Sequence, residues 1–250
     1  LILAGIGFAA GFINTLAGSG SLITLPFLMF LGLPANVANG TNRIAILLQN
    51  VVAVGSFNQQ KVFTFKEGIW YSLPAVIGAI IGAQIAVELN EKIMEYVIGG
   101  LLVFMFFFLM FKPGAWIKEK ALDVRAKPTV LQFFLLFIIG LYGGFIQAGV
   151  GLFILAGLVL CVGFDLVKAN AIKLFIVLMY TIFALAIFII NDMVDWKFGL
   201  ILAAGNMTGA FIASRFAVSW GAKFVRYVLL FVLFGASLKI FGVLEYVFGI

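Results

Sequence analysis

The stretch Gly11–Arg43, GFINTLAGSGSLITLPFLMFLGLPANVANGTNR, decides the fold predicted for this chain. It is mostly apolar but is interrupted twice, first by Gly18-Ser19-Gly20-Ser21 and then by polar residues from Asn36 to Arg43. Glycines allow the chain to turn and allow another group to approach the backbone closely. In a membrane, such interrupted backbone is tolerated only where protein buries it or where it lines a wet cavity. A weaker copy of the stretch returns between Gly144 and Lys173.

The composition predicts a membrane protein. Of the 250 residues, 64% are hydrophobic and 10% are charged, and the mean hydropathy is +1.22, whereas a soluble domain carries about 25% charged residues. The net charge of +6 fits the Lys and Arg that collect in cytoplasmic loops, so we expect a lipid bilayer and no nucleic acid as partner. The chain has no His and a single Cys, Cys161, which excludes internal disulfides, His-based metal sites and His-dependent catalytic triads. We expect no cofactor, no bound metal and a multi-pass location in the cytoplasmic membrane.

Apolar segments divide the chain into two halves. A helix that spans a bilayer needs ~20 apolar residues. The segments are Leu1–Leu16, Ser21–Leu31, Thr41–Phe57, Gly68–Val87 and Lys92–Phe111, then Thr129–Ala148, Leu152–Val162, Ala171–Ile190, Lys197–Phe216 and Lys223–Ile240. The short first pair predicts a helical hairpin that either spans or re-enters. We therefore expect an all-α polytopic protein with a first repeat at 1–111, a basic linker at 112–128 and a second repeat at 129–250.

The two halves match at one constant offset. Matching positions are Gly18, Gly20 and Gly32 with Gly149, Gly151 and Gly163; Ala38-Asn39 with Ala169-Asn170; Lys66 and Gly68 with Lys197 and Gly199; and Lys92 and Tyr96 with Lys223 and Tyr227. Chance similarity between apolar segments gives scattered Leu and Ile matches, not a register of Gly, Asn, Lys and Tyr. The constant offset predicts an internal repeat with broken helices at Gly18–Gly20 and Gly149–Gly151.

Loop charges predict that the repeats have opposite orientations. The linker 112–128 is the most basic loop, so we expect it to be cytoplasmic. The loop at 61–67 is then inside and net positive, and the turn at 88–95 is outside and net negative. Past the linker the signs reverse, since 192–197 is net negative and 223–226 is net positive. Inverted repeats of this kind are typical of secondary transporters, whose substrate site lies near the midplane between the repeats.

The chain resembles the sulfite exporter family of the TauE/SafE type over nearly its whole length. The strongest match is Gly32-Leu33-Pro34 followed by Ala38-Asn39-Gly40-Thr41-Asn42. The second copy keeps Gly163, Ala169 and Asn170 but has Ala171-Ile172-Lys173 in place of Gly-Thr-Asn. The resemblance implies a membrane transporter for sulfur-containing anions: sulfite, sulfonates such as sulfoacetate, or related organic anions.

The two glycine breaks are the first candidate binding site. A helix that begins at such a turn presents free N–H groups and about half a positive charge, which suits an anion. The alternative is that these glycines only permit close helix packing. The candidates are Gly18, Ser19, Gly20 and Ser21 in the first break and Gly149 and Gly151 in the second.

Polar side chains beside the breaks are the second group of candidates. Asn14 and Gln147 precede the breaks at near-equivalent positions, and two amides can donate to the oxygens of one anion. The residues that precede or begin the next segments are Asn39, Thr41, Asn42 and Asn170. The alternative is that these side chains cap or join neighbouring helices.

Arg43 and Lys173 are the candidate cations. A Lys or Arg at the centre of a membrane helix costs ~2.5–3.5 kcal/mol, so such residues usually mark function, but near a helix end the side chain can snorkel. We expect them near the mouths of the pathway, Arg43 toward the outside and Lys173 toward the inside. Lys168 is expected to be an ordinary loop charge. No Asp or Glu lies in the middle of a predicted helix, which favours an anion over a cation or proton as substrate.

We expect a transporter and not an enzyme, and we keep two alternative classes of function, a subunit and an enzyme. A non-autonomous subunit of a larger membrane complex has no need of inverted repeats, and an integral-membrane enzyme needs a nucleophile, base or metal set that the sequence does not supply. The sequence leaves open the exact anion, the direction of transport, the coupling ion and whether the chain forms a homo-oligomer.

Overall fold

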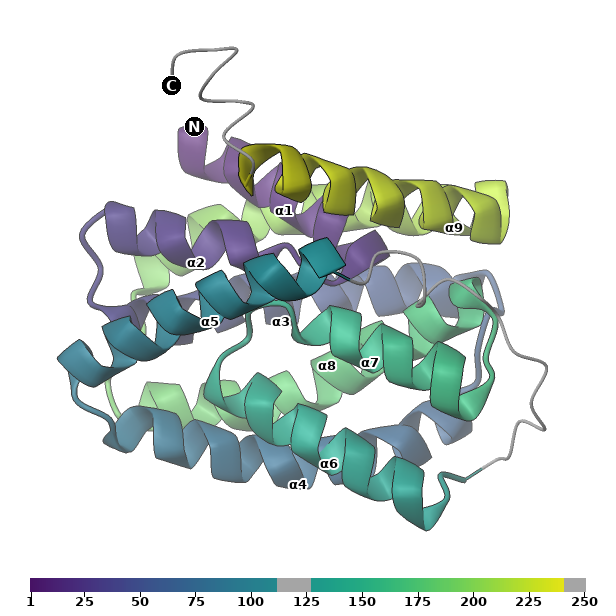
Figure 1. The fold of residues 1–250 in the computed structure, drawn as a ribbon, viewed down its shortest axis with the longest axis horizontal. Helices are drawn as coiled ribbons and strands as arrows, with labels where there is room; N and C mark the ends of the chain where they lie inside the picture. The colour runs from purple at the N-terminus through teal and green to yellow at the C-terminus, as the bar shows by residue number, and fades with distance from the viewer. Residues whose placement is uncertain (112–126, 241–250) are drawn as a thin grey trace.

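The computed structural model describes residues 1–111 and 127–240, and that part of the chain is helical, without a strand. The helices are α1 (Ile2–Ala17), α2 (Ser21–Phe30), α3 (Ala35–Gln59), α4 (Phe65–Glu88), α5 (Glu91–Phe111), α6 (Val130–Phe145), α7 (Val150–Gly157), the π-helix η2 (Leu158–Val162), α8 (Leu166–Ile190) and α9 (Trp196–Ile240) (Figure 1). Within the described ranges, three helices are long and apolar enough to cross a membrane: Phe65–Glu88, Leu166–Ile190 and Trp196–Trp220.

Helix boundaries follow local capping signals. Thr64 and Glu67 form a capping box at the start of α4, and Thr129 and Gln132 form one at the start of α6. Asp165 accepts hydrogen bonds from the first-turn N–H groups of α8. Each cap satisfies backbone donors that have no partner inside the helix, so these helices begin where the sequence supplies an acceptor.

Backbone turns recur at equivalent places in the two halves. Positive φ angles occur, among the described residues, at Gly18 and Gly149 (78° and 72°), at Gly32 and Gly163 (92° each) and at Lys61 and Asp192 (55° each). Each pair has the same separation along the chain, which is the offset at which the two halves match. The predicted breaks are present, since Gly18 ends α1 and Gly149 precedes α7. Gly151, however, lies in the first turn of α7, because the second break is formed by Ile146–Gly149.

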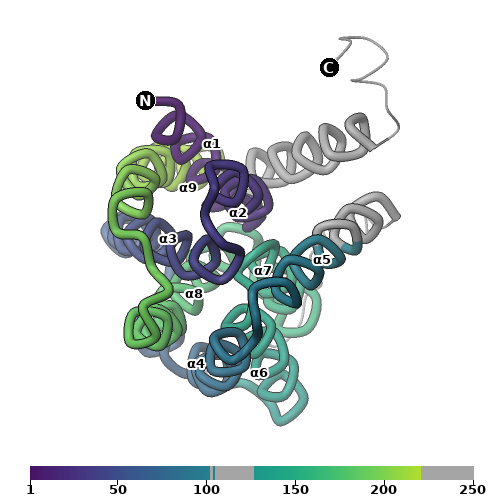
Figure 2. The backbone as a smooth tube through the Cα atoms, turned by 90° about the vertical axis from the view of Figure 1, so that its left-hand side faces the viewer, coloured from purple at the N-terminus to yellow at the C-terminus, as the bar shows by residue number. Residues whose placement is uncertain are grey.

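Seen end-on, α1 lies beside α9 on one side of the bundle and α4 beside α6 on the other, with α3 and α8 between them (Figure 2). The first helix of each half therefore packs on a helix of the other half. Glycines bring these backbones together: an added Cβ at Gly140 would lie 2.5 Å from the Cα of Ala75, and one at Gly11 would lie 2.6 Å from the Cα of Asn206. Small residues at helix contacts are typical of membrane bundles.

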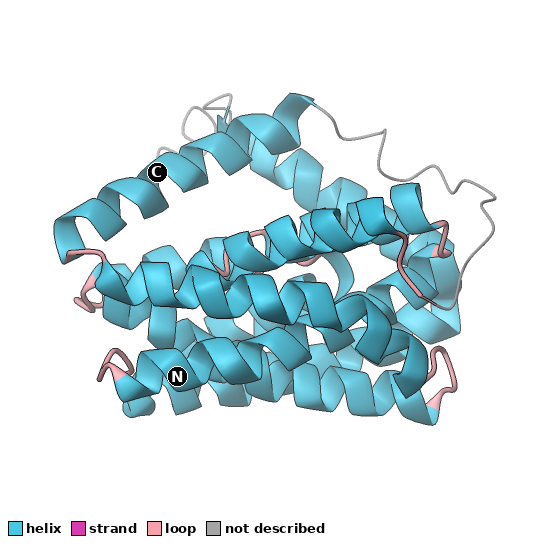
Figure 3. Cartoon of the chain, turned by 90° about the horizontal axis from the view of Figure 1, so that it is seen from below, coloured by secondary structure: helices cyan, strands magenta, loops and turns pink. Residues whose placement is uncertain are grey.

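Connections gather at the two opposite ends of the bundle, while the two breaks lie between the ends (Figure 3). At one end, Asn36 donates to the Leu89 carbonyl and the Asp195 N–H donates to Thr41, each over 2.8 Å. These bonds join the start of α3 to the α4–α5 and α8–α9 connections.

The other end is joined by a separate set of contacts. Lys168 and Glu67 form an ion pair of 3.0 Å, which joins the start of α8 to the start of α4. Gln132 at the start of α6 donates to the Cys161 carbonyl over 2.8 Å. Lys127 stacks over the ring of Trp70 on α4, 4.3 Å from its centroid.

Three predicted boundaries were wrong. The helices expected from Thr41 and Ala171 begin earlier, at Ala35 and Leu166, so the polar residues from Asn36 to Arg43 lie inside the first of them. The two segments expected at Lys197–Phe216 and Lys223–Ile240 form one helix, α9. In the first half, the Asn90 side chain caps the N-terminus of α5 by accepting a hydrogen bond from Ile93 N–H. The equivalent residue in the second half is Gly221, which has no side chain that could cap a separate helix there. The predicted linker 112–128 falls, apart from its last two residues, outside the described residues.

Candidate functional site

The tips of two helical hairpins meet in the middle of the bundle. α1 has 16 residues and α2 has 10, lengths of about 24 and 15 Å that fall short of a bilayer core. Gly18 closes the first hairpin in a left-handed turn, and α6 and α7 form the second. A Cβ at Gly18 would lie 2.5 Å from the Cα of Gly151, and a Cβ at Gly151 would lie 2.5 Å from the Cα of Gly18. Gly18 in the first break is therefore in direct backbone contact with the first turn of α7, which follows the second break.

Arg43 binds the broken end of the other half. Its side chain is 0% exposed. Nη1 donates to the Gly143 carbonyl and to Gln147 Oε1, both at 3.2 Å, and Nη2 donates to the Gly144 carbonyl at 2.6 Å. Longer bonds of 3.4 Å reach the Phe145 carbonyl and Asn39 Oδ1. Because the last carbonyls of a helix have no partner within it and carry a partial negative charge, Arg43 acts as the C-terminal cap of α6.

Lys173 has the reciprocal position. Its side chain is 1% exposed. Nζ donates to the carbonyls of Asn14 and Thr15 at 3.2 and 3.0 Å, and also to Oδ1 of Asn170. Thr15 lies in the last turn of α1, so Lys173 caps the broken end of the first half. Each half thus supplies a buried cation to the break of the other.

Amide side chains connect the hairpins to the long helices. Gln49 Oε1 accepts hydrogen bonds of 3.2 Å from both Asn14 and Asn206, which belong to α1 and α9. In the second half Gln147 Nε2 donates to the Tyr180 hydroxyl at 2.9 Å. Gln49 and Tyr180 correspond at the offset that relates the two halves, so the two sets of bonds occupy equivalent places. Such bonds between polar groups in a membrane bundle typically contribute about 1 kcal/mol each.

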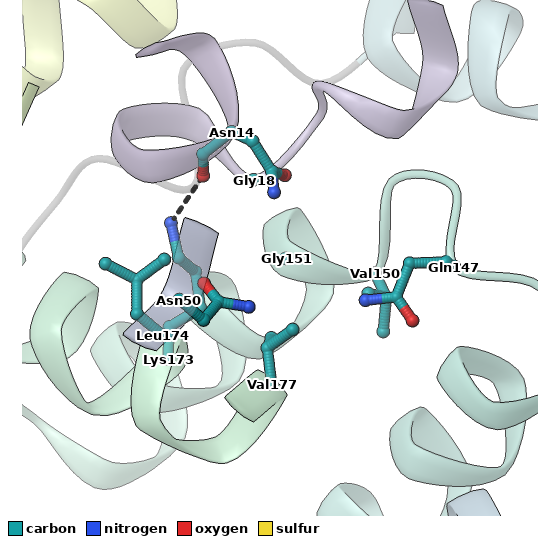
Figure 4. Close-up of a pocket in the computed structure, with 9 residues that line it drawn as sticks. All are labelled: Asn14, Gly18, Asn50, Gln147, Val150, Gly151, Lys173, Leu174 and Val177. Atoms are coloured by element: carbon teal, nitrogen blue, oxygen red, sulfur yellow. Dashed lines mark hydrogen bonds between the residues drawn. The ribbon is translucent and has the colours of Figure 1, made fainter. Parts of the chain in front are cut away.

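A small cavity lies between the hairpin tips and the middle of α3 and α8 (Figure 4). It is lined by Asn14, Gly18, Asn50, Gln147, Val150, Gly151, Lys173, Leu174 and Val177. About 10 Å³ of it is open to the centre of a water molecule, which is room for about one water. Five of the residues predicted from the sequence, namely Asn14, Gly18, Gln147, Gly151 and Lys173, therefore line one space.

The remaining predicted residues lie around this cavity or farther away. Asn39, Arg43 and Asn170 contact the broken helix ends or the cation there. Asn42 accepts a bond of 2.7 Å from Thr24 on α2, and Thr41 binds the α8–α9 connection. Ser19, Gly20 and Ser21 are buried in the first break and Gly149 forms the second. None of these positions lines the cavity.

One expectation about roles was wrong. Arg43 and Lys173 do not lie at open mouths, since both side chains are fully buried against helix ends. The alternative that Asn39, Thr41, Asn42 and Asn170 cap helix N-termini also fails, because α3 and α8 begin earlier, at Ala35 and Leu166. Asn39 and Asn42 do join neighbouring helices, through bonds to α6 and α2.

Four polar residues of this region were missed by the sequence reasoning. They are Gln49 and Asn50 on α3, Tyr180 on α8 and Asn206 on α9, and all four are buried. The available signal was a polar group inside a predicted apolar segment and far from any turn.

A family comparison identifies the chain. The model of the sulfite exporter TauE/SafE family matches residues 3–240. The chain belongs to the TauE/SafE family. No solved structure matches it significantly.

Curated relatives of this TauE/SafE protein carry transporter descriptions. A probable membrane transporter protein, ORF9, from Sinorhizobium sp is 29% identical over 233 residues, which cover 93% of this chain and 88% of the relative. A probable membrane transporter protein from Haemophilus influenzae is 27% identical over 242 residues, covering 95% and 92%. The probable membrane transporter protein YfcA from Escherichia coli K12 is 29% identical over 232 residues, covering 91% and 84%. The chain is therefore a membrane transporter of the TauE/SafE family, which agrees with the expectation that it is not an enzyme.

Proposed function

We propose that this TauE/SafE protein is a secondary transporter that moves a small sulfur-containing or organic anion, such as sulfite or a sulfonate like sulfoacetate, across the cytoplasmic membrane. Transport proceeds by alternating access around a midplane site between two inverted repeats. One observation carries this proposal: two glycine-containing hairpin tips from opposite halves touch at a buried point, and each half supplies a buried cation, Arg43 or Lys173, that holds the broken helix of the other half.

The charge of this region favours an anion. The buried charged side chains among the described residues are Arg43 and Lys173, and no Asp or Glu is buried with them. The ion pair of Lys168 with Glu67 lies at one end of the bundle, and its side chains are 28% and 25% exposed. The groups that offset the two buried cations are neutral: backbone carbonyls, amide side-chain oxygens and, for Arg43, the ring of Phe188. A desolvated anion placed between the tips gains a favourable charge and amide donors. A transported cation would instead be repelled by the positive charges of Arg43 and Lys173.

The pairing of the halves supports alternating access. Each cation belongs to a long helix of one half and holds the broken helix of the other, so a movement of one half displaces the opposite hairpin tip. The cavity accommodates about one water, so an anion needs the tips to separate. Rocking of one repeat against the other would open the site to each side in turn.

Reconstituted transport tests the substrate class. In proteoliposomes that contain the purified protein, we expect sulfite or sulfoacetate uptake well above that of protein-free vesicles, with no carriage of sodium or potassium in place of the anion. Selective cation flux would contradict the proposal. Flux that requires a co-purifying second protein would favour the alternative of a non-autonomous subunit, and turnover of the anion into a product would favour an enzyme.

Cysteine labelling tests the inverted topology. Two sets of contacts support this topology: Asn36 and Thr41 bind the connections after α4 and α8 at one end, and Glu67 pairs with Lys168 at the other. With Cys161 replaced, single cysteines at Asn90 and Asp192 are expected to react with a membrane-impermeant maleimide in intact cells, and those at Lys61 and Lys118 only after permeabilisation. Labelling of Lys61 and Asp192 from the same side would contradict inversion.

A further inference from the structure

Asn50 is a buried amide that no group in the described part of the protein satisfies. It lies in the middle of α3, is 0% exposed and lines the cavity between the hairpin tips. Neither its Nδ2 nor its Oδ1 has a hydrogen-bond partner among the residues that the structure describes. Figure 4 shows the amide turned toward the space enclosed by the labelled residues. A buried unpaired amide is costly, so a group that enters this space and pairs with it is favoured.

Two other amides of the cavity wall, Asn14 and Gln147, each keep one N–H that can donate to a ligand. Lys173 carries the charge, but its three hydrogens are directed to three protein acceptors. Asn14 and Gln147 each use one bond of their NH2 group, to Gln49 and to Tyr180. The Oε1 of Gln147 already accepts from Arg43. The oxygens of an anion therefore find donors here, and Asn50 Oδ1 adds an acceptor that an anion oxygen cannot satisfy.

Rotating the Asn50 amide by 180° does not remove the need for a donor at its oxygen. Both ends of the amide are unpaired, so exchanging Oδ1 and Nδ2 only moves the unsatisfied acceptor to the other side of the same group. A fully deprotonated sulfonate group only accepts hydrogen bonds. A monoanion that keeps one hydroxyl, such as hydrogen sulfite, accepts from the amide N–H groups and donates to Oδ1.

We propose that Asn50 is a substrate-contacting, specificity-determining residue that selects small monoanions bearing a hydroxyl hydrogen over anions of the same size and charge without one. This inference rests on the proposed anion transport and narrows its substrate class. Thr181, the residue equivalent to Asn50 in the second half, is also buried, and its hydroxyl has no partner within the described ranges. It does not line the cavity and therefore provides a matched control.

Two nearly isosteric probes test the selection. Methylphosphonate, at mildly acidic pH where it is a monoanion, carries one hydroxyl, and methanesulfonate carries none. Calorimetric titration of the purified protein is expected to give an affinity for methylphosphonate about tenfold higher, since the sulfonate leaves Oδ1 unpaired. Asn50→Leu should bind both more weakly and with a ratio near one, while Thr181→Val should keep the wild-type ratio.

The outcomes separate this inference from the proposed function. Equal affinity of the wild type for both probes overturns the role of Asn50 and leaves anion transport standing. Absence of binding of either probe, together with absence of sulfite binding, overturns the anion site as well. If Asn50→Leu still prefers methylphosphonate to methanesulfonate by the wild-type ratio, another residue makes the selection and the inference is overturned. If that variant does not fold, the wild-type ratio still decides, and Asn50→Ala takes its place.

Discussion

Arg43→Met is expected to abolish transport and to destabilise the folded protein by about 1–3 kcal/mol, the cost typical of leaving a buried polar group without its partner. The change leaves the carbonyls of Gly143 and Gly144 and the Gln147 amide oxygen without their donor in the interior of the bundle. Methionine has a similar length and no charged group, so the loss is that of the guanidinium. Thermal unfolding in detergent and anion flux in proteoliposomes measure the two effects.

Lys168→Met is the matched control for this prediction. It removes a cation of the partly exposed ion pair with Glu67, and such pairs contribute about 0–1 kcal/mol. Arg43→Lys should be intermediate, since an ammonium keeps the charge but cannot reproduce the planar fork of donors. If Arg43→Met is as stable and as active as Lys168→Met, Arg43 does not hold the broken end of α6 in the working protein.

Gly151→Ala is expected to reduce anion flux at least tenfold. The added Cβ would lie 2.5 Å from the Cα of Gly18, a separation that folded proteins do not accommodate without moving the backbone. Gly151 is an ordinary helical residue in α7, so backbone strain does not contribute. Overpacking of this kind costs about 1–3 kcal/mol and forces the hairpin tips apart.

Gly55→Ala is the control, because Gly55 lies inside α3 and an added methyl group there would meet no described heavy atom within 4 Å. This change should be neutral or slightly stabilising, since alanine is a better helix former by about 1 kcal/mol. Flux is measured in proteoliposomes at equal protein content, with helical content checked by circular dichroism. Wild-type flux in Gly151→Ala would show that contact between the tips is not needed for transport.

Gly18 and Gly32 separate contact from backbone strain. Both have positive φ, 78° and 92°, which alanine adopts at a cost of about 1–2 kcal/mol. Of the two, Gly18 also faces the opposite hairpin, whereas no described atom lies within 4 Å of a Cβ at Gly32. Any excess loss of flux in Gly18→Ala over Gly32→Ala therefore measures the contact between the two halves.

Local physical chemistry made much of the fold predictable. Glycine turns at Gly18 and Gly149, apolar segment lengths and capping residues act within a few positions of the chain, so the breaks and most helices could be read from the sequence. A helix boundary was harder to predict where no capping side chain marks it. Gly221 stands where Asn90 caps α5 in the first half, and α9 continues through that position.

The membrane class, the two breaks and their repetition at a constant offset were predictable, because hydropathy and glycine conformation are local properties of the chain. Which polar groups meet depends instead on how the helices pack. Arg43 contacts carbonyls about one hundred residues away, and Lys173 contacts carbonyls almost one hundred and sixty residues away. The pattern of apolar residues along the chain does not predict these contacts between a cation of one half and a helix end of the other. They arise because the first helix of each half packs on the other half. That packing buries both cations and leaves Asn50 facing the cavity.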